Sequence, residues 1–365
     1  MAAFTAKDVQ ALREKTNVGM MDCKKALVEA DGDVEKAIDI LREKVLATAA
    51  KKAGRIAAEG VIGLYTDGAA SALVELNCET DFVGNNPEFK ALANQIAKTV
   101  VEVKPADLDA LLATTISEGS LSVADSIQEL FLKIRENLKL RRFALVEGKA
   151  VSYIHGGGSV GVLVNFDTDL AVDNAEFVAM GKNIAMQVAA MNPEYLSKED
   201  ISADELAKIK SITVDSSLNK PESLPKPILR KLIDKAMAEK LWSDEDCAAY
   251  EEQKNNNFLF NFLSKEAVAT LASLAVAGKE EIAADKIFAG AVEGRVKKQL
   301  KEIILLEQTF VRSDLFDGTV AGYVADVAKK LGADIKVLGF TRLAKGEGIE
   351  KKEDNFAEEV ASMMK

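Results

Sequence analysis

Few residues of this chain have the types and spacing that catalysis requires. His155 is the only histidine, and it lies beside Gly156–Gly158, a run that favours a hairpin turn over a phosphate-binding loop. Three widely spaced cysteines, Cys23, Cys78 and Cys247, argue against a zinc site or a disulfide framework and favour a reducing compartment. The sequence contains neither G-x-x-x-x-G-K-S/T nor a G-x-G-x-x-G after a strand. We therefore expect no enzyme, no cofactor, no metal and no nucleotide bound by the chain itself.

Composition and charge narrow the class of protein further. The 365 residues, 48% hydrophobic and 29% charged, are typical of a globular chain with several structural units. A net charge of −11 argues against broad contact with nucleic acid, although Lys139, Arg141 and Arg142 could form a local basic patch. No apolar stretch approaches about 18 residues, and the N-terminus has no apolar signal region, so a cytoplasmic protein without membrane contact is expected.

Two acidic residues, Asp81 and Asp169, hold matched positions in an internal repeat. Residues 59–100 align with residues 147–188 without a gap. Other identical pairs include Asn77 and Asn165, Thr80 and Thr168, and Asn86 and Asn174. The matched positions favour a capping role for both aspartates at a strand-to-helix loop over metal binding or acid catalysis.

Hydrophobic periodicity and turn residues predict the elements that position these side chains. Each repeat is predicted to form strand, turn, strand, loop and helix, which gives an α+β fold with antiparallel strands. The expected strands are 61–65, 72–76, 151–154, 160–165 and 335–340. The expected helices are three short ones within 5–46, then 87–101, 106–115, 122–140, a charged helical region at 196–300 with an apolar helix or helix pair at 258–276, and 355–364.

Two loops carry apolar residues that are open to two interpretations. Met20 and Met21 lie at the first turn of the N-terminal helices, where they either fill a small core or form an adaptable contact surface. Phe82 lies in the polar loop 80–85, where it is either a core residue or an exposed anchor of an interface. Its counterpart in the second copy, Leu170, is expected to be core.

Several motifs, in order along the chain, resemble those of the bacterial elongation factor Ts family. They are Thr16–Leu27 (TNVGMMDCKKAL), Asn77–Val83 (NCETDFV), His155-Gly156, Val292–Arg295 and Gly346–Glu350. The resemblance covers about residues 1–205 and 287–365. It implies a guanine-nucleotide exchange factor that binds elongation factor Tu, in its GDP-bound and nucleotide-free states, during translation elongation. The alternative is a protein-binding scaffold without exchange activity.

The resemblance also implies a domain organisation. Residues 1–54 would form a three-helix, ubiquitin-associated-like docking domain, and residues 55–145 the first copy of the core. The second copy would comprise residues 146–205 and 287–345. Between its parts, residues 206–286 would form a protruding helical hairpin, longer than is usual in the family and without a recognisable motif. Residues 346–365 would form a C-terminal helical module.

The family pattern further implies which residues contact the partner. Thr80, Asp81, Phe82 and Val83 would dislodge the magnesium ion of the GTPase, with Phe82 as the intruding side chain. Further contacts would come from Leu12, Arg13, Met20, Met21, Ile134, Arg135 and His155. Arg135 departs from the family, which usually has an Ile-Gly pair where this chain has Ile134-Arg135.

Overall fold

The computed structural model describes residues 4–350, except residues 17, 53 and 257. The chain divides into two compact units. The first contains Met1–Asn192, Phe310–Gly318 and Gly322–Lys365, and the second contains Pro193–Thr309 and Thr319–Ala321. The expected C-terminal helix at 355–364 lies outside the described residues.

The first unit begins with three helices, as predicted: α1 (Ala6–Thr16), α2 (Met20–Glu29) and α3 (Val34–Lys52). Apolar residues spaced three or four apart on α1 and α2 meet in a small core that includes Leu12, Cys23 and Leu27, all fully buried. Leu12, predicted from the family pattern to touch the partner, is therefore a core residue of this bundle in the structure.

The internal repeat appears as two copies of one unit, which confirms the α+β class. Both α5 (Pro87–Val103) and α8 (Ala175–Met191) begin after a capping asparagine and end at a residue with left-handed backbone, Lys104 and Asn192. The paired strands are β1 (Glu59–Thr66) and β2 (Ala70–Cys78) in the first copy, and β4 (Lys149–His155) and β5 (Val160–Thr168) in the second.

Each copy has a third strand, which follows the second strand only after a long intervening segment of chain. The orders β1-β2-β3 and β4-β5-β6 are antiparallel, with β3 at Lys139–Glu147 and β6 at Ile335–Ala344. Between β2 and β3 the chain also forms α4 (Asp81–Gly84), α6 (Leu108–Ala113) and α7 (Val123–Ile134). The predicted helix at 122–140 is therefore too long, because Arg135 takes a positive φ of 61° that ends α7 before β3 starts.

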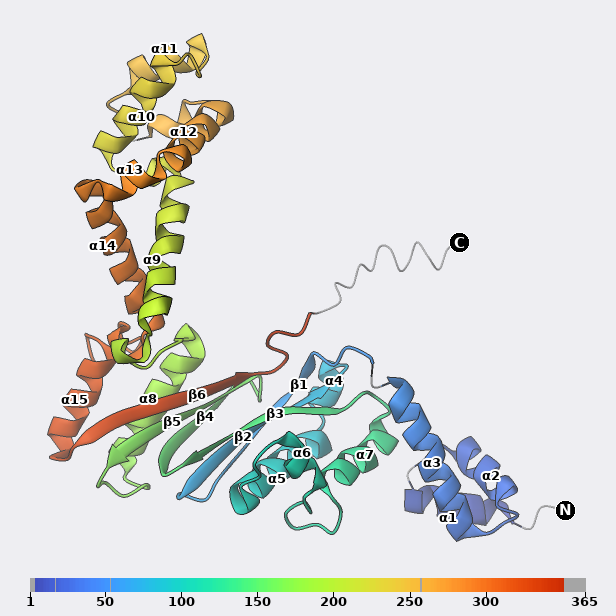
Figure 1. The fold of residues 1–365 in the computed structure, drawn as a ribbon. Coiled ribbons are helices and arrows are strands. Elements are labelled where there is room, and N and C mark those ends of the chain that lie inside the picture. Colours follow the sequence, from blue (N-terminus) through green and yellow to red (C-terminus); the bar gives the residue numbers. More distant parts are fainter. Residues whose placement is uncertain (1–3, 17, 53, 257, 351–365) are drawn as a thin grey trace, which may run out of the picture. The chain divides into compact units, whose positions relative to one another are not determined.

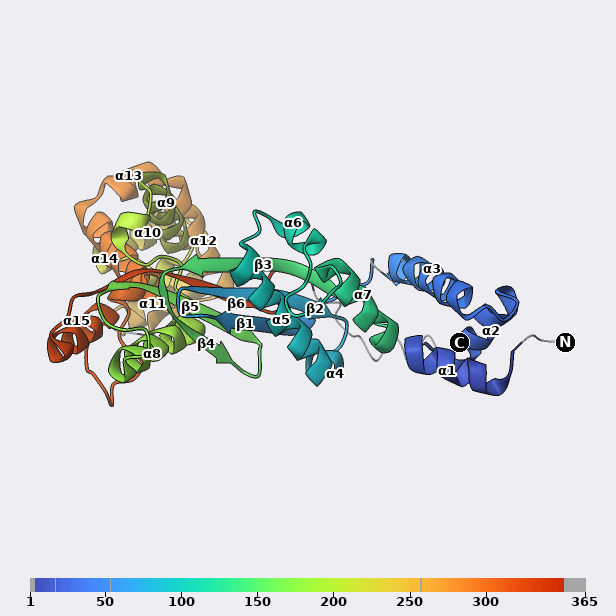
Figure 2. The same cartoon turned by 90° about the horizontal axis from the view of Figure 1, so that it is seen from below.

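The two sheets face each other, with a helix on the outer side of each. Every residue of β2 is buried because both faces of the strand are covered. One face packs against α5 through residues such as Val74 and Leu76. The other face packs against the second sheet, where Leu73 lies near Leu163. On the outer faces, α5 covers β1 and β2, and α8 covers β4 and β5. Seen from below in Figure 2, α7 lies beside α5.

The second unit is helical and has its own core. Its helices are α9 (Ala203–Leu218), α10 (Lys226–Ala238), α11 (Asp244–Gln253), α12 (Lys265–Ala277), α13 (Lys279–Ala284) and α14 (Lys286–Ile303). Leu218, Leu271 and Phe288 are fully buried within it, and the indole of Trp242 donates to the carbonyl of Ala267. The apolar stretch 258–276 forms a short 3-10 turn, Leu259–Asn261, and then α12. α15 (Val320–Leu331) follows before β6, and no described helix is long and apolar enough to cross a membrane.

Candidate partner-binding turn

The loop that follows β2 projects one aromatic side chain. Thr80 precedes the single helical turn α4, and its hydroxyl accepts a hydrogen bond from the amide of Val83. We call Thr80–Gly84 the Phe82 turn. Asp81 is exposed, Val83 packs partly against the core, and Phe82 is 85% exposed. The four predicted residues thus lie on one turn, and its aromatic side chain is largely exposed, as expected of an interface anchor.

The corresponding loop of the second copy has a different structure, although the two sequences align. It forms no helical turn, and the amide of Leu170 donates to the hydroxyl of Thr168. A Cβ atom on Gly84 would lie 3.1 Å from the carbonyl oxygen of Gly60, so the close packing of the Phe82 turn on β1 favours glycine. Val172 takes that position in the second copy. Leu170 is only half-buried, so the expectation that it is a core residue is wrong.

Phe82 lies at the border of two surface hollows. One is lined by Val83, Asn86, Glu88, Leu130, Lys133 and Ile134, so the structure brings Ile134 to the Phe82 turn. The other is lined by residues of the segment before β1, by the turn itself and by Lys345. Both hollows combine apolar and charged side chains.

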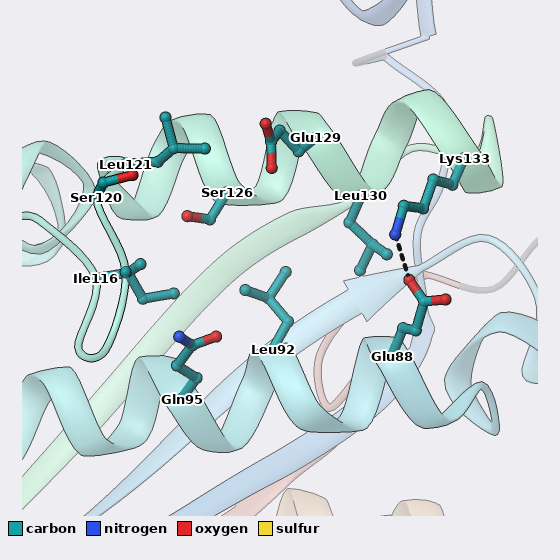
Figure 3. A pocket seen from close by; sticks show the side chains of 11 residues that line it. Glu88, Leu92, Gln95, Ile116, Ser120, Leu121, Ser126, Glu129, Leu130 and Lys133 are labelled. Carbon is teal, nitrogen blue, oxygen red and sulfur yellow. Dashed lines mark hydrogen bonds and ion pairs between the residues drawn. The ribbon is translucent and has the colours of Figure 1, made fainter. Parts of the chain in front are cut away.

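A further hollow continues the first one between α5 and α7 (Figure 3). Leu92 and Leu130 point into it from the two helices, and Ile116 adds a third apolar side chain. Glu88, Leu130 and Lys133 line both hollows, and the Lys133 ammonium lies 2.7 Å from the Glu88 carboxylate. The surface beside Phe82 therefore extends along these helices.

The other predicted contact residues lie at separate places. Met20 and Met21 are 42% and 63% exposed at the start of α2, so the contact interpretation of this pair is favoured over the core interpretation. Arg13 is exposed on α1. The exposed His155 ends β4, with its Nδ1 2.9 Å from the hydroxyl of Tyr153, and lines neither hollow beside Phe82.

Arg135 makes its contact within the chain. Its guanidinium lies 3.3 Å from the carboxylate of Asp22 on α2, and its carbonyl accepts a hydrogen bond from the Lys52 ammonium. The residue also occupies the left-handed position where a glycine would be least strained. In this structure, Arg135 joins the N-terminal helices to the end of α7.

The residues that hold the Phe82 turn in place by hydrogen bonds were not predicted from the sequence. The carboxylate of Glu136 accepts hydrogen bonds from Glu79 and Thr80, and the thiol of Cys78 donates to the carbonyl of Thr80. Glu136 is far from Thr80 in the sequence, and no local pattern marks the contact. The one sequence signal is the repeat, in which the loop at 80–84 differs from its counterpart at 168–172.

Cys78 is expected to be chemically inert in the folded protein. Burial raises the pKa of its thiol to about 12, and the nearby Glu136 carboxylate adds to the rise. Cys23 is also buried, with a raised pKa, whereas Cys247 is partly exposed.

Since the thiolate is the reactive form, iodoacetamide at neutral pH should add one group to the native protein, at Cys247, and three after denaturation. Intact mass spectrometry checks this, and Cys247→Ser should abolish native labelling. A second adduct on the native protein would contradict it.

Comparison with known proteins gives a consistent result. The sequence model of the family described as "Elongation factor TS" matches residues 79–254 and 236–347. The chain is 40% identical to "Elongation factor Ts" of Clostridioides difficile (strain 630) over 369 residues, covering 100% of both chains. It is also 40% identical to "Elongation factor Ts" of Clostridium acetobutylicum, over 99% of this chain and 98% of the relative. The corresponding protein of Clostridium botulinum (strain Eklund 17B / Type B) is 38% identical, over 99% of each chain.

These matches bear on residues 206–286. The family match includes this segment, and the alignments span nearly the full length of each relative without room for a large extra insertion. The expected enlargement is therefore not seen against these relatives.

Proposed function

Because this chain belongs to the elongation factor Ts family, it is a guanine-nucleotide exchange factor for elongation factor Tu in translation elongation, and we propose that the Phe82 turn performs the exchange. The observation that carries this proposal is the 85% exposure of Phe82 on a turn whose first residue, Thr80, is held by hydrogen bonds to Glu136 and Cys78. The alternative of a scaffold without exchange activity has no support from the relatives, which match over the whole chain.

The proposed mechanism needs no covalent chemistry. In a GTPase, Mg²⁺ bridges the nucleotide phosphates to a small number of protein ligands. Phe82 would enter between elements of elongation factor Tu, and Asp81 and Thr80 would accompany it. A small displacement of the groups that bind magnesium and phosphate then weakens the binding of GDP to elongation factor Tu. By linkage, bound GDP weakens the affinity of this protein for elongation factor Tu by the same factor. Elongation factor Tu therefore passes between a GDP-bound complex and a nucleotide-free complex with this protein. The protein therefore acts by binding and is not an enzyme.

We assign docking to surfaces outside the turn. The N-terminal helices, proposed to be a ubiquitin-associated-like domain, present Met20, Met21 and Arg13, and Ile134 extends the surface beside Phe82. His155 is proposed as a further contact, and Val83 as a support of the turn. The net charge of −11 favours a protein partner over nucleic acid, and the cytoplasm is the proposed location because translation takes place there.

Release of fluorescent GDP from elongation factor Tu tests the function directly. The full-length protein should accelerate release at substoichiometric concentration, since it is regenerated in each cycle. Failure to accelerate release from the cognate GTPase would overturn the function. Direct binding of GDP by this protein alone would overturn the mechanism.

A double substitution separates docking from exchange. Met20→Ala with Met21→Ala should raise the concentration for half-maximal GDP release by about tenfold or more, since exposed apolar anchors contribute about 1–2 kcal/mol each to such interfaces. The maximal rate and the melting temperature should change little because both side chains lie on the surface. Val28→Ala, at a 57% exposed position on the same helix, is the matched control. An unchanged half-maximal concentration would show that the methionines do not dock.

A further inference from the structure

Glu136, which directly follows the left-handed Arg135 after the end of α7, reaches across to the start of the Phe82 turn. Its Oε2 atom accepts hydrogen bonds from the backbone amides of Glu79, at 3.1 Å, and Thr80, at 3.0 Å. Its Oε1 atom accepts a third from the hydroxyl of Thr80, at 2.6 Å. One carboxylate thus fixes the backbone and the side chain of Thr80, the residue that precedes α4.

The segment around Glu136 is itself fixed. The amide of Asn137 donates to the Glu79 carboxylate at 2.7 Å, and that carboxylate also pairs with Arg55. The side-chain amide of Asn137 donates to the carbonyl of Arg55 at 2.8 Å. Glu136 thus accepts from the amide of Glu79, and Glu79 accepts from the amide of Asn137, so neither chain segment can shift without breaking several hydrogen bonds.

The second copy of the repeat shows what the same loop does without such a carboxylate. Thr168 corresponds to Thr80, but its hydroxyl accepts a hydrogen bond from the Leu170 amide and its carbonyl accepts one from the Lys149 ammonium. That loop forms no helical turn, and its apolar residue Leu170 is half-buried. The helical turn and the exposed Phe82 therefore occur in the copy in which the Glu136 carboxylate contacts the loop.

We propose that Glu136 is the positioning residue of nucleotide exchange, which acts by holding Thr80 so that Phe82 is presented in advance of docking. This inference rests on the proposed function of the Phe82 turn. Hydrogen bonds from amides and a hydroxyl to a carboxylate are stronger than those between neutral groups. A turn fixed in this way loses little conformational entropy when it enters elongation factor Tu. The complex in which GDP is bound weakly is therefore favoured.

The test uses the full-length protein and fluorescent GDP on elongation factor Tu. Glu136→Ala should lower the maximal release rate by about tenfold or more, because displacement of an acting group by about 1 Å has effects of this size. The concentration for half-maximal release should change little, since Met20 and Met21 remain in place. Glu136→Gln, which keeps one acceptor oxygen, should recover part of the rate. Glu147→Gln, at an exposed carboxylate paired with Lys104, is the matched control and should behave as wild type.

A double-mutant cycle distinguishes positioning from general weakening of the structure. If Glu136 acts through Phe82, then Phe82→Ala and Phe82→Ala with Glu136→Ala should release GDP at the same rate. Additive losses, or a normal rate for Glu136→Ala, would overturn the inference while leaving the function intact. Loss of acceleration by wild type would instead overturn the function. If Glu136→Ala does not fold, Glu136→Gln takes its place: it should lower the maximal rate when Phe82 is present but not in the Phe82→Ala background. A normal rate, or an equal loss in both backgrounds, would overturn the inference.

Discussion

Phe82→Ala is expected to lower the maximal rate of GDP release by about 30-fold, which corresponds to the loss of an interface anchor worth about 2 kcal/mol. The side chain is 85% exposed, so its removal takes little packing from the protein, and the melting temperature should stay within about 1 °C. The rate is best measured at saturating protein, where weaker docking is not mistaken for loss of exchange.

The repeat supplies a matched control for this substitution. Leu170 occupies the same position in the second copy and is half-buried, so Leu170→Ala should leave the rate unchanged and lower stability modestly, by less than the about 2–5 kcal/mol of a fully buried leucine. Phe82→Leu separates size from aromatic character and should retain part of the rate. A Phe82→Ala protein that unfolds readily, or that releases GDP at the wild-type rate, would make Phe82 an ordinary structural residue.

The two loops also show how far sequence reasoning reached. Alignment of the copies predicted two strands and a helix in each, because hydrophobic periodicity and caps are local properties that repeat with the sequence. The exposure of Phe82 stayed open, because it depends on Gly84 packing against Gly60 and on Glu136, which contacts Thr80 across a long stretch of chain. Such non-local contacts leave no periodic signal.

The third strand of the first copy was difficult to predict for a related reason. Residues 139–147 carry Arg141 and Arg142, which break the alternation expected of a half-buried strand, and the helix predicted at 122–140 overlaps only the start of this segment. In the structure both guanidinium groups turn toward the buried carboxylate of Glu75 on β2. They form neither a helix face nor an open basic patch, since their partner is supplied by the neighbouring strand.

Glu75 is expected to be the side chain whose charge matters most for the stability of the core. It is fully buried and accepts from Arg141 at 3.0 Å and from Arg142. The backbone amide of Gly346 donates to it at 2.7 Å, so the segment after β6 is tied to β2 as well. Its side chain thus joins three parts of the first unit that are distant in the sequence.

Glu75→Gln should lower the free energy of unfolding by about 3–5 kcal/mol, because it removes the anion from a buried pair and leaves the arginine charges without it. Glu347→Gln is the matched control. Glu347 pairs with Arg142 and Arg342 in the same network, but its side chain is 44% exposed, so water replaces the lost contact and the cost should stay below about 1 kcal/mol. Thermal denaturation of both variants, followed by circular dichroism, measures the difference. Equal shifts in melting temperature would mean that burial of the Glu75 carboxylate does not decide its contribution, and that the core is held by its apolar packing alone.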